Sequence, residues 1–262
     1  MKRKLAFHKY QGAGNDFVLI DDRAGLFDTN DRALIERLCD RRFGIGADGL
    51  MLLREKSGFD FEMVYFNSDG RPSSMCGNGG RCISRFAADL GLSDKRVLHF
   101  LAVDGPHEAE LKDRIVKLKM NDVRAIEKGP DYYLLDTGSP HFVRYVVNLE
   151  AFDVYSEGRT VRYSERFAQA GVNVNFVELR PGGIAIRTYE RGVENETLAC
   201  GTGVTAAALT AALKGAATSE THCAVAARGG DLNVYFRREG EAFSEVWLEG
   251  GAEFVFRGEI EI

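Results

Sequence analysis

The chain has 262 residues, a hydrophobic fraction of 45% and a formal net charge of −5. These values are typical of a globular protein with a core, in one large domain or two of ordinary size, and they argue against nucleic acid as a partner. No stretch approaches the roughly 18 apolar residues that a membrane span needs, and no apolar run follows the basic N-terminus as in an export signal. With an odd count of five cysteines, we therefore expect a cytoplasmic protein with reduced thiols and no membrane partner.

The first half of the chain is predicted to combine several strands with two helices. A helix is expected after residues 29–31, which offer an N-cap, because Leu34, Ile35, Leu38 and Cys39 form an apolar stripe. A second helix is expected from residue 77 to a stop at Gly91. Strands are expected over residues 4–10, 17–20, 50–53, 59–66, 97–103 and 108–120, of which the third and fourth form a hairpin.

A second half begins near Asn121 and repeats this order of signals. Residues 136–143 parallel residues 12–18, and a strand over 184–189 leads to Glu190 as residues 63–66 lead to Asn67. The remaining elements are a short helix over 162–167, a long helix from 201 to about 215, and strands over 172–179, 222–227, 231–237, 244–248 and 253–257. The matched order predicts an internal duplication into two similar α/β halves, each with many strands around one long central helix.

The strongest local signal is a pair of matching stretches, residues 74–82 and 198–204. Each places a cysteine, Cys76 or Cys200, directly before Gly-x-Gly and then runs into a predicted helix. Unpaired N–H groups and the helix dipole favour negative charge at a helix N-terminus. Both cysteines are therefore expected in a setting that favours the reactive thiolate.

Two such cysteines suit the inversion of a carbon acid. If the two halves face each other across a cleft, one thiolate can remove a proton from one face of a carbon while the other thiol protonates the opposite face. The helix N-termini can hold a carboxylate and disperse the charge that develops when the proton leaves. This chemistry is that of a racemase or epimerase.

Other interpretations of the cysteines and glycines are weaker. Cys39, Cys82 and Cys223 do not precede Gly-x-Gly and are expected to be small buried hydrophobes. No Cys-x-x-Cys or paired Cys/His spacing supports a metal site. The Gly-x-Gly stretches do not extend to Gly-x-Gly-x-x-Gly, so they are a weak signal for a nucleotide.

Taken together, the motifs resemble those of the diaminopimelate epimerase family. The matching stretches occur in the family's order over nearly the whole chain and comprise residues 12–18, 67–70, 75–82, 138–141, 172–174, 189–192 and 196–203. The resemblance implies a cofactor-independent isomerase that interconverts LL- and meso-2,6-diaminopimelate in lysine and peptidoglycan-precursor biosynthesis. No metal or cofactor is expected.

The resemblance also implies a role for each matching residue. Cys76 and Cys200 match the two acid/base cysteines of the family. The residues that match those holding the α-carboxylate are Gly77, Asn78, Gly201 and Thr202. The residues that match those recognising the substrate, including its distal amino and carboxylate groups, are Asn15, Asn67, Asn173, Glu190 and Arg191. His141 follows a family histidine near the site, and Ser139 stands where many members have asparagine, so both are accessory candidates. Residues 71–74 also differ from the small and acidic residues usual before the first cysteine.

The implied fold is a pair of pseudo-symmetric α/β (α+β) domains, each a mostly antiparallel barrel-like sheet wrapped around a central helix. The expected N-terminal domain is residues 1–121, completed by residues 251–262, and the expected C-terminal domain is residues 122–250. The active site is expected in the cleft between them, and such enzymes are commonly homodimers.

Three other functions stay open. One is a same-fold racemase or isomerase of another amino acid, such as proline or hydroxyproline, although a site for a distal amino-acid end, at Glu190 and Arg191, argues against it. Another is a redox-responsive thiol protein in which Cys76 and Cys200 form a regulatory disulfide. The third is a binding module without turnover.

Overall fold

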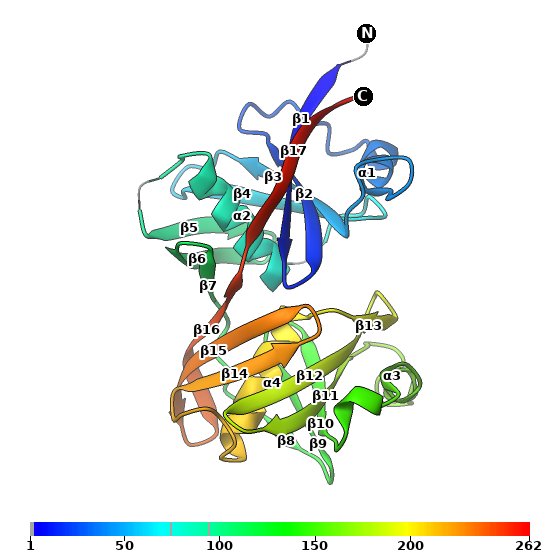
Figure 1. Cartoon of the computed structure of the whole chain (residues 1–262), viewed down its shortest axis with the longest axis vertical. Helices are drawn as coiled ribbons and strands as arrows, with labels where there is room; N and C mark the ends of the chain where they lie inside the picture. Colours follow the sequence, from blue (N-terminus) through cyan, green and yellow to red (C-terminus); the bar gives the residue numbers. More distant parts are fainter. Residues whose placement is uncertain (1–2, 74, 94) are drawn as a thin grey trace. The chain divides into compact units, whose positions relative to one another are not determined.

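The computed structural model describes residues 3–73, 75–93 and 95–262, and its chain divides into two compact units. The first unit comprises the residues up to Leu118 together with Gly251–Ile262, and the second comprises Lys119–Gly250 (Figure 1). Ser74 of the first cysteine motif lies outside the described residues. Within the described ranges, none of the helices has the length and apolar character needed to cross a membrane.

The first unit is a mostly antiparallel sheet with two helices. Its elements are β1 (Lys4–Gly12), β2 (Asn15–Asp21), α1 (Arg32–Cys39), β3 (Gly49–Arg54), β4 (Phe61–Asn67), α2 (Gly77–Asp89), β5 (Val97–Ala102), β6 (Gly105–Lys112), β7 (Ile115–Lys119) and β17 (Glu253–Glu261). The two parallel pairs, β2–β3 and β4–β5, are those whose connections contain α1 and α2. A parallel pair needs such a crossover, whereas the antiparallel pairs are joined by short turns or formed by β17 on β1.

Alternation along these strands separates an outer face from an inner face. Outward residues such as Val18 and Leu50 are buried in one apolar cluster with Ile35 and Leu38 of α1. Inward residues face α2: a Cβ placed on Gly79 of that helix would lie 2.1 Å from the Cε atom of Met51. Figure 1 shows α2 among the strands of this unit and α1 at its side.

The second unit repeats this plan. Its elements are β8 (Glu127–Lys128), β9 (Tyr132–Asp136), β10 (Pro140–Tyr145), the 3-10 helix η1 (Leu149–Ala151), α3 (Val154–Arg162), β11 (Asn173–Arg180), β12 (Gly183–Glu190), β13 (Asn195–Thr197), α4 (Gly201–Leu213), β14 (His222–Ala227), β15 (Gly230–Glu239) and β16 (Ala242–Gly251). Here β10–β11 and β12–β14 are the parallel pairs, with α3 and α4 in their connections. The predicted duplication and fold class are therefore confirmed.

Registers match between the units position by position. Phe17 pairs with Gly49 as His141 pairs with Asn173, and Met51 pairs with Tyr65 as Asn175 pairs with Thr188. The outer face of the second sheet is again apolar, with Phe142, Val174 and Phe176 buried against Val154 of α3. The inner face again meets a glycine of the central helix, because a Cβ placed on Gly203 would lie 2.4 Å from Oδ1 of Asn175.

The central helices end where the sequence predicts. Gly91 and Gly215 follow α2 and α4 with φ angles of +67° and +70°, which a residue with a Cβ rarely adopts. Helix α4 is buried along almost its whole length, and its many alanines allow the surrounding strands to approach it closely.

Two predicted elements are wrong. The short helix expected over residues 162–167 is instead α3, at Val154–Arg162. Asp153 is its N-cap, and the Asp153 carboxylate accepts a hydrogen bond of 3.0 Å from the Ser156 N–H. The single strand expected over residues 108–120 is two strands, β6 and β7, because Asp113 takes a φ of +52° and turns the chain back.

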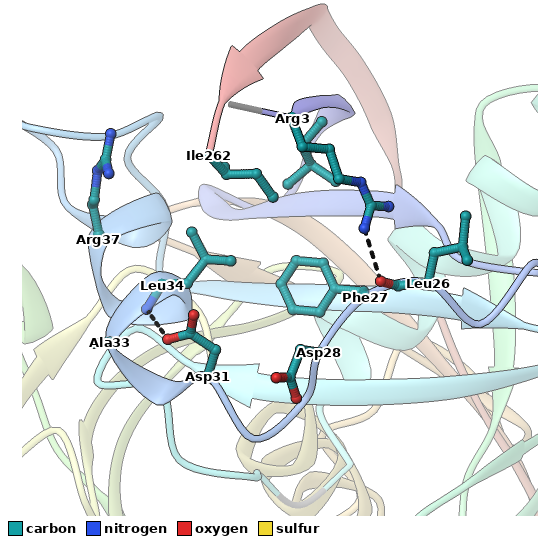
Figure 2. A pocket seen from close by; sticks show the side chains of 10 residues that line it. Arg3, Leu26, Phe27, Asp28, Asp31, Ala33, Leu34, Arg37 and Ile262 are labelled. Carbon is teal, nitrogen blue, oxygen red and sulfur yellow. Dashed lines mark hydrogen bonds between the residues drawn. The ribbon is translucent and has the colours of Figure 1, made fainter. Parts of the chain in front are cut away.

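A cavity of about 510 Å³ opens on the first unit beside α1 (Figure 2). Its lining is mainly apolar side chains with an acidic and basic rim, namely Arg3, Leu5, Leu26, Phe27, Asp28, Asp31, Ala33, Leu34, Arg37 and Ile262. Among the described residues that line it, none is a site residue predicted from the sequence.

Candidate active site

Cys76 and Cys200 occupy equivalent backbone positions. Cys76 is the N-cap of α2 with φ −117° and ψ 122°, and Cys200 is the N-cap of α4 with φ −115° and ψ 111°. The carbonyl of each cysteine accepts the first intrahelical hydrogen bond, from Gly80 at 2.7 Å and from Val204 at 2.8 Å. The first-turn N–H groups of Gly77, Asn78, Gly201 and Thr202 follow directly, so each thiol lies at a helix end that favours an anion. The predicted helix starts are confirmed.

The first half-site, in the first unit, joins Asn15 to the cysteine motif. The Oδ1 atom of Asn15 lies 3.4 Å from Nδ2 of Asn78 and 3.7 Å from Sγ of Cys76. The other end of the amide is fixed, because Nδ2 of Asn15 donates to the Asp48 carboxylate at 2.6 Å. Asp48 was not among the residues predicted from the sequence. It lies in a separate glycine-rich loop, and only the fold brings it to Asn15.

A buried arginine supports the same half-site from within α2. Arg81 is fully buried and donates from Nη2 to Oδ1 of Asn78 at 3.0 Å and from Nη1 to the carbonyl of Gly77 at 3.3 Å. It therefore fixes the amide that the resemblance places on the substrate carboxylate. Arg81 lies three residues after Asn78 and four residues after Gly77 in a predicted helix, and this spacing could have identified it from the sequence.

The predicted residue Asn67 lies at the exposed end of β4, opposite Gly49, on the same face as Tyr65.

The second half-site, in the second unit, joins three predicted residues directly. The Ser139 hydroxyl oxygen accepts from Nδ2 of Asn173 at 2.9 Å and from Nη2 of Arg191 at 3.2 Å. Oδ1 of Asn173 in turn accepts from the backbone N–H of Arg191 at 2.9 Å. The Ser139 hydroxyl is therefore an acceptor shared by Asn173 and Arg191. It holds the exposed Arg191 guanidinium beside the N-terminal ends of β10 and β11.

The remaining predicted residues of this half-site lie at the ends of β12 and α4. A carboxylate oxygen of Glu190 accepts from the Thr197 hydroxyl at 2.9 Å. The Thr202 hydroxyl lies 3.4 Å from Sγ of Cys200, and the Thr202 carbonyl accepts from the Thr137 hydroxyl at 2.8 Å. Thr137 and Thr197 were not predicted, because a lone threonine in a turn or short strand has no distinctive sequence pattern.

His141 is a buried, neutral imidazole. Burial, and after it the positive charge of Arg191, lower the pKa of His141 from 6.5 to about 3. Its Nδ1 atom lies 3.1 Å from Nδ2 of Asn175, which is also fully buried. Asn175 was not among the residues predicted from the sequence, although it lies two residues after Asn173 and therefore points to the same face of β11.

The other cysteines have no such setting. Cys39, Cys82 and Cys223 are buried, and burial raises the pKa of their thiols to about 12, about 12 and about 11. The prediction that they are small buried hydrophobes is confirmed. Within the described part of the chain, no three or more His, Cys, Asp or Glu side chains are grouped so as to hold a metal ion.

Solved structures define the class of fold. A phenazine biosynthesis protein of the PhzF family from Bacillus anthracis superposes with a TM-score of 0.77 over 99% of this chain and 100% of that chain, at 14% identity. A hydroxyproline epimerase from Agrobacterium vitis superposes with a TM-score of 0.70 over 100% of this chain and 94% of that chain, at 15% identity. The protein thus has the two-repeat, sheet-dominated α/β fold of this class.

Sequence comparison identifies the family within that class. The diaminopimelate epimerase family model matches residues 7–126 and 133–255. The chain is 48% identical to a diaminopimelate epimerase of Flavobacterium psychrophilum over 96% of this chain and 98% of that protein. It is 44% identical to one of Chlorobaculum tepidum over 96% and 99% of the two chains. The chain belongs to the diaminopimelate epimerase family, and the family resemblance seen in its motifs is confirmed.

Proposed function

We propose that the protein epimerises LL-2,6-diaminopimelate to meso-2,6-diaminopimelate with two cysteine bases and no cofactor, as a step in lysine and peptidoglycan-precursor biosynthesis. Family membership supports the substrate and the reaction class. The single observation that supports the mechanism is the equivalent N-cap position of Cys76 and Cys200 on two matching helices. Epimerisation needs one base on each face of the reacting carbon, and forward and reverse turnover exchange the roles of the two.

In the proposed reaction, Cys76 and Cys200 act on opposite faces of the reacting carbon. One thiolate takes the α-proton, and the electron pair of the broken C–H bond is delocalised toward the α-carboxylate. The N–H groups of Gly77, Asn78, Gly201 and Thr202 stabilise that charge. The opposite thiol then donates its proton to the other face of the carbon, which inverts the centre and leaves a thiolate there.

The distal end of the substrate is assigned to Glu190 and Arg191 of the second unit, and the asparagines of both units are assigned to substrate recognition. Arg191 can bind the distal carboxylate through two parallel hydrogen bonds, and Glu190 can accept from the distal ammonium. Asn15, Asn67 and Asn173 can donate to a carboxylate or accept from an ammonium. Ser139 and Asn173 support this assignment, since both hold Arg191 in place.

We further propose a cytoplasmic homodimer. The thiolate chemistry needs reduced cysteines, which the cytoplasm maintains. Strand β17 exposes large apolar side chains on both of its faces: Phe254, Val255 and Phe256 are between 44% and 51% exposed, and Phe254 pairs with Tyr10 while Phe256 pairs with the adjacent Lys9. Exposed apolar side chains are typical of a protein–protein interface, and a second copy of the chain is the proposed occupant. The double variant Val255→Lys, Phe256→Lys is expected to be monomeric in sedimentation, whereas an unchanged oligomeric state would exclude this surface.

A panel of amino acids tests the proposed reaction against its alternatives. Reduced protein is incubated separately with LL-diaminopimelate, meso-diaminopimelate, L-proline and trans-4-hydroxy-L-proline, and the stereoisomers are separated by chiral chromatography. Interconversion of the two diaminopimelates alone is the expected result. Inversion of a proline substrate would favour the same-fold racemase. Binding of diaminopimelate without turnover would favour a binding module. Absence of binding and turnover in reduced protein, together with a Cys76–Cys200 disulfide detected by mass measurement when the reductant is left out, would favour the redox protein.

A further inference from the structure

A polar trio lies inside the second unit where the first unit has apolar and aromatic residues. His141 on β10, Asn175 on β11 and Thr188 on β12 lie on the face of the sheet that meets α4, and all three are buried. The matching register positions of the first unit hold Phe17, Met51 and Tyr65. The same fold is therefore built in the first unit without a histidine, an asparagine or a threonine at these positions. Burying three polar side chains costs stability unless each is hydrogen-bonded, so the trio requires an explanation beyond packing.

The orientation of the Asn175 amide follows from its neighbours. Its Nδ2 atom lies 2.9 Å from the carbonyl oxygen of Phe142 and 3.5 Å from that of Asn173, and both oxygens can only accept. Its Oδ1 atom lies 3.0 Å from the Thr188 hydroxyl, which donates to it. A flipped amide would set Oδ1 against two carbonyl oxygens. The nitrogen therefore faces β10, and Thr188 fixes the other end of the amide.

This orientation determines which nitrogen of His141 bears the proton. Because Nδ2 of Asn175 is a donor, Nδ1 of His141, 3.1 Å away, must accept and carries no hydrogen. The imidazole is neutral, so its one hydrogen is on Nε2. Among the described residues, the buried Nε2 atom of His141 has no hydrogen-bond partner. The Nε2–H group is thus a donor that is fixed in one tautomer and has no acceptor among the described residues. It can donate to an acceptor that a bound molecule supplies.

The surroundings indicate the chemistry of that acceptor. His141 follows Ser139 by two residues on the same face of the chain, and it is opposite Asn173 in register. Ser139 and Asn173 are the residues that hold Arg191. Arg191 is also the charged group whose field acts on the imidazole. A neutral N–H donor beside a guanidinium suits a carboxylate oxygen.

We propose that Asn175 is a positioning residue for the epimerisation: it holds His141 as the Nε2–H tautomer, so that Nε2–H donates to a carboxylate oxygen of the bound amino acid. Thr188 acts one step further away by holding the Asn175 amide. The inference rests on the proposed function for the identity of the ligand. The tautomer of His141 does not depend on that function and is tested separately.

The test compares the wild type with Asn175→Asp, Thr188→Val and the matched control Asn233→Asp. Asn233 also contacts a histidine in the same unit, with Oδ1 2.8 Å from Nε2 of His222, but it lies on β15 and has no role in the proposed site. An ionised aspartate only accepts, so in Asn175→Asp the imidazole must place a proton on Nδ1. The readouts are the ¹⁵N chemical shifts of His141 in the full-length protein, assigned with a His141→Gln variant, and kcat and KM for LL-diaminopimelate.

We expect the wild-type spectrum to show a neutral Nε2–H tautomer. Asn175→Asp should show a proton on Nδ1 and lose about 10²-fold in kcat/KM, the order of loss expected from a misplaced site group. Thr188→Val should lose about tenfold, because a mobile amide holds the tautomer only part of the time. Asn233→Asp should keep wild-type turnover.

The outcomes separate this inference from the proposed function. A wild-type spectrum with the proton on Nδ1 or on both nitrogens would overturn the inference whatever the activity. Normal turnover by Asn175→Asp with a changed tautomer would overturn the role of the tautomer while leaving the epimerase intact. Absence of turnover by the wild type would instead overturn the proposed function. If Asn175→Asp does not fold, unchanged turnover by Thr188→Val overturns the inference.

Discussion

The two units follow one plan at the central helix but differ in the strands that surround it. In both helices, the fifth residue after the cysteine donates a side-chain hydrogen bond to the carbonyl of the first residue after the cysteine. Arg81 donates to Gly77 at 3.3 Å, and Thr205 donates to Gly201 at 3.0 Å. In the strands, however, Asn67 of the first unit is matched by Glu190 of the second, and the first unit is largely apolar where the second is polar. The common features suit a reaction with two equivalent bases, and the differences suit a substrate whose two ends are recognised differently.

The largest expected effect comes from removing either base. Cys76→Ser and Cys200→Ser should each lower epimerisation by about 10³-fold or more, because a hydroxyl is a far weaker base than a thiolate and neither cysteine can replace the other. Initial rates in both directions measure the loss. Cys82→Ser and Cys223→Ser, at buried cysteines of the two units, are matched controls that should lose stability but keep turnover per folded molecule. Near-normal turnover in either site variant would exclude the two-base mechanism.

The next effect tests the difference between Asn67 and Glu190. Glu190→Ala and Arg191→Ala should each reduce kcat/KM for LL-diaminopimelate by about 10²-fold, because a buried or bidentate ion pair with the distal end is lost. Arg166→Ala is a suitable control, since Arg166 is a half-exposed arginine of the same unit that pairs with Glu127 at 2.6 Å. If the site variants resemble the control, the distal end is not recognised in the second unit.

A pH-dependent effect on stability tests the difference between Phe17 and His141. The folded-state pKa of His141, about 3, is below the value of 6.5 for an unfolded chain, so the unfolded state binds a proton first as pH falls. The histidine therefore costs stability below about pH 6.5, at about 1.4 kcal/mol per pH unit until about pH 3. Compared with His141→Phe, the wild type should lose about 2 kcal/mol more unfolding free energy between about pH 7 and about pH 5. Urea denaturation at both pH values measures this, and parallel losses would show that His141 is not neutral when folded.

The smallest effect compares the glycines in the first turn of the two helices. In Gly79→Ala the new methyl meets the flexible end of Met51, which can move, and the helix gains up to about 1 kcal/mol in propensity. In Gly203→Ala it meets Oδ1 of Asn175, which Thr188 holds, so a loss of about 1–3 kcal/mol is expected. Thermal unfolding of the two variants measures the difference. Equal losses would mean that Asn175 is as mobile as Met51.

Local patterns in the sequence predicted the elements but not the contacts between them. The helix starts at Cys76 and Cys200 follow from a cysteine before glycines and an apolar run, and the stops follow from Gly91 and Gly215. The helix at Val154–Arg162 was misplaced because its signal is an N-cap, Asp153, with few apolar residues after it. Apolar periodicity gave no warning of the break between β6 and β7, because Asp113 adopts a backbone conformation unusual for a residue with a side chain.

For the candidate site, too, the sequence predicted the residues that lie in motifs but not the partners that those residues contact in the fold. The family resemblance supplied the residues that match its motifs, but it gave no role to Asp48, Arg81, Asn175 or Thr188. Each of these acts through another residue: Asp48 through Asn15, and Asn175 through His141. Asp48 and Asn175 depend on strand register and loop packing, which bring together positions more than thirty residues apart, as with the 34 residues between His141 and Asn175. No local pattern encodes that distance.

The most direct test of the two-base account is deuterium incorporation. Reduced protein is incubated with LL-diaminopimelate in D₂O, and α-deuterium is followed by mass spectrometry while stereochemistry is followed by chiral chromatography. The account predicts meso product that carries deuterium at the inverted carbon, because the second thiol delivers a proton that has exchanged with solvent. Deuterium incorporation with retained configuration would contradict delivery from the opposite thiol. Absence of both signals in folded, reduced protein would contradict the proposed reaction itself.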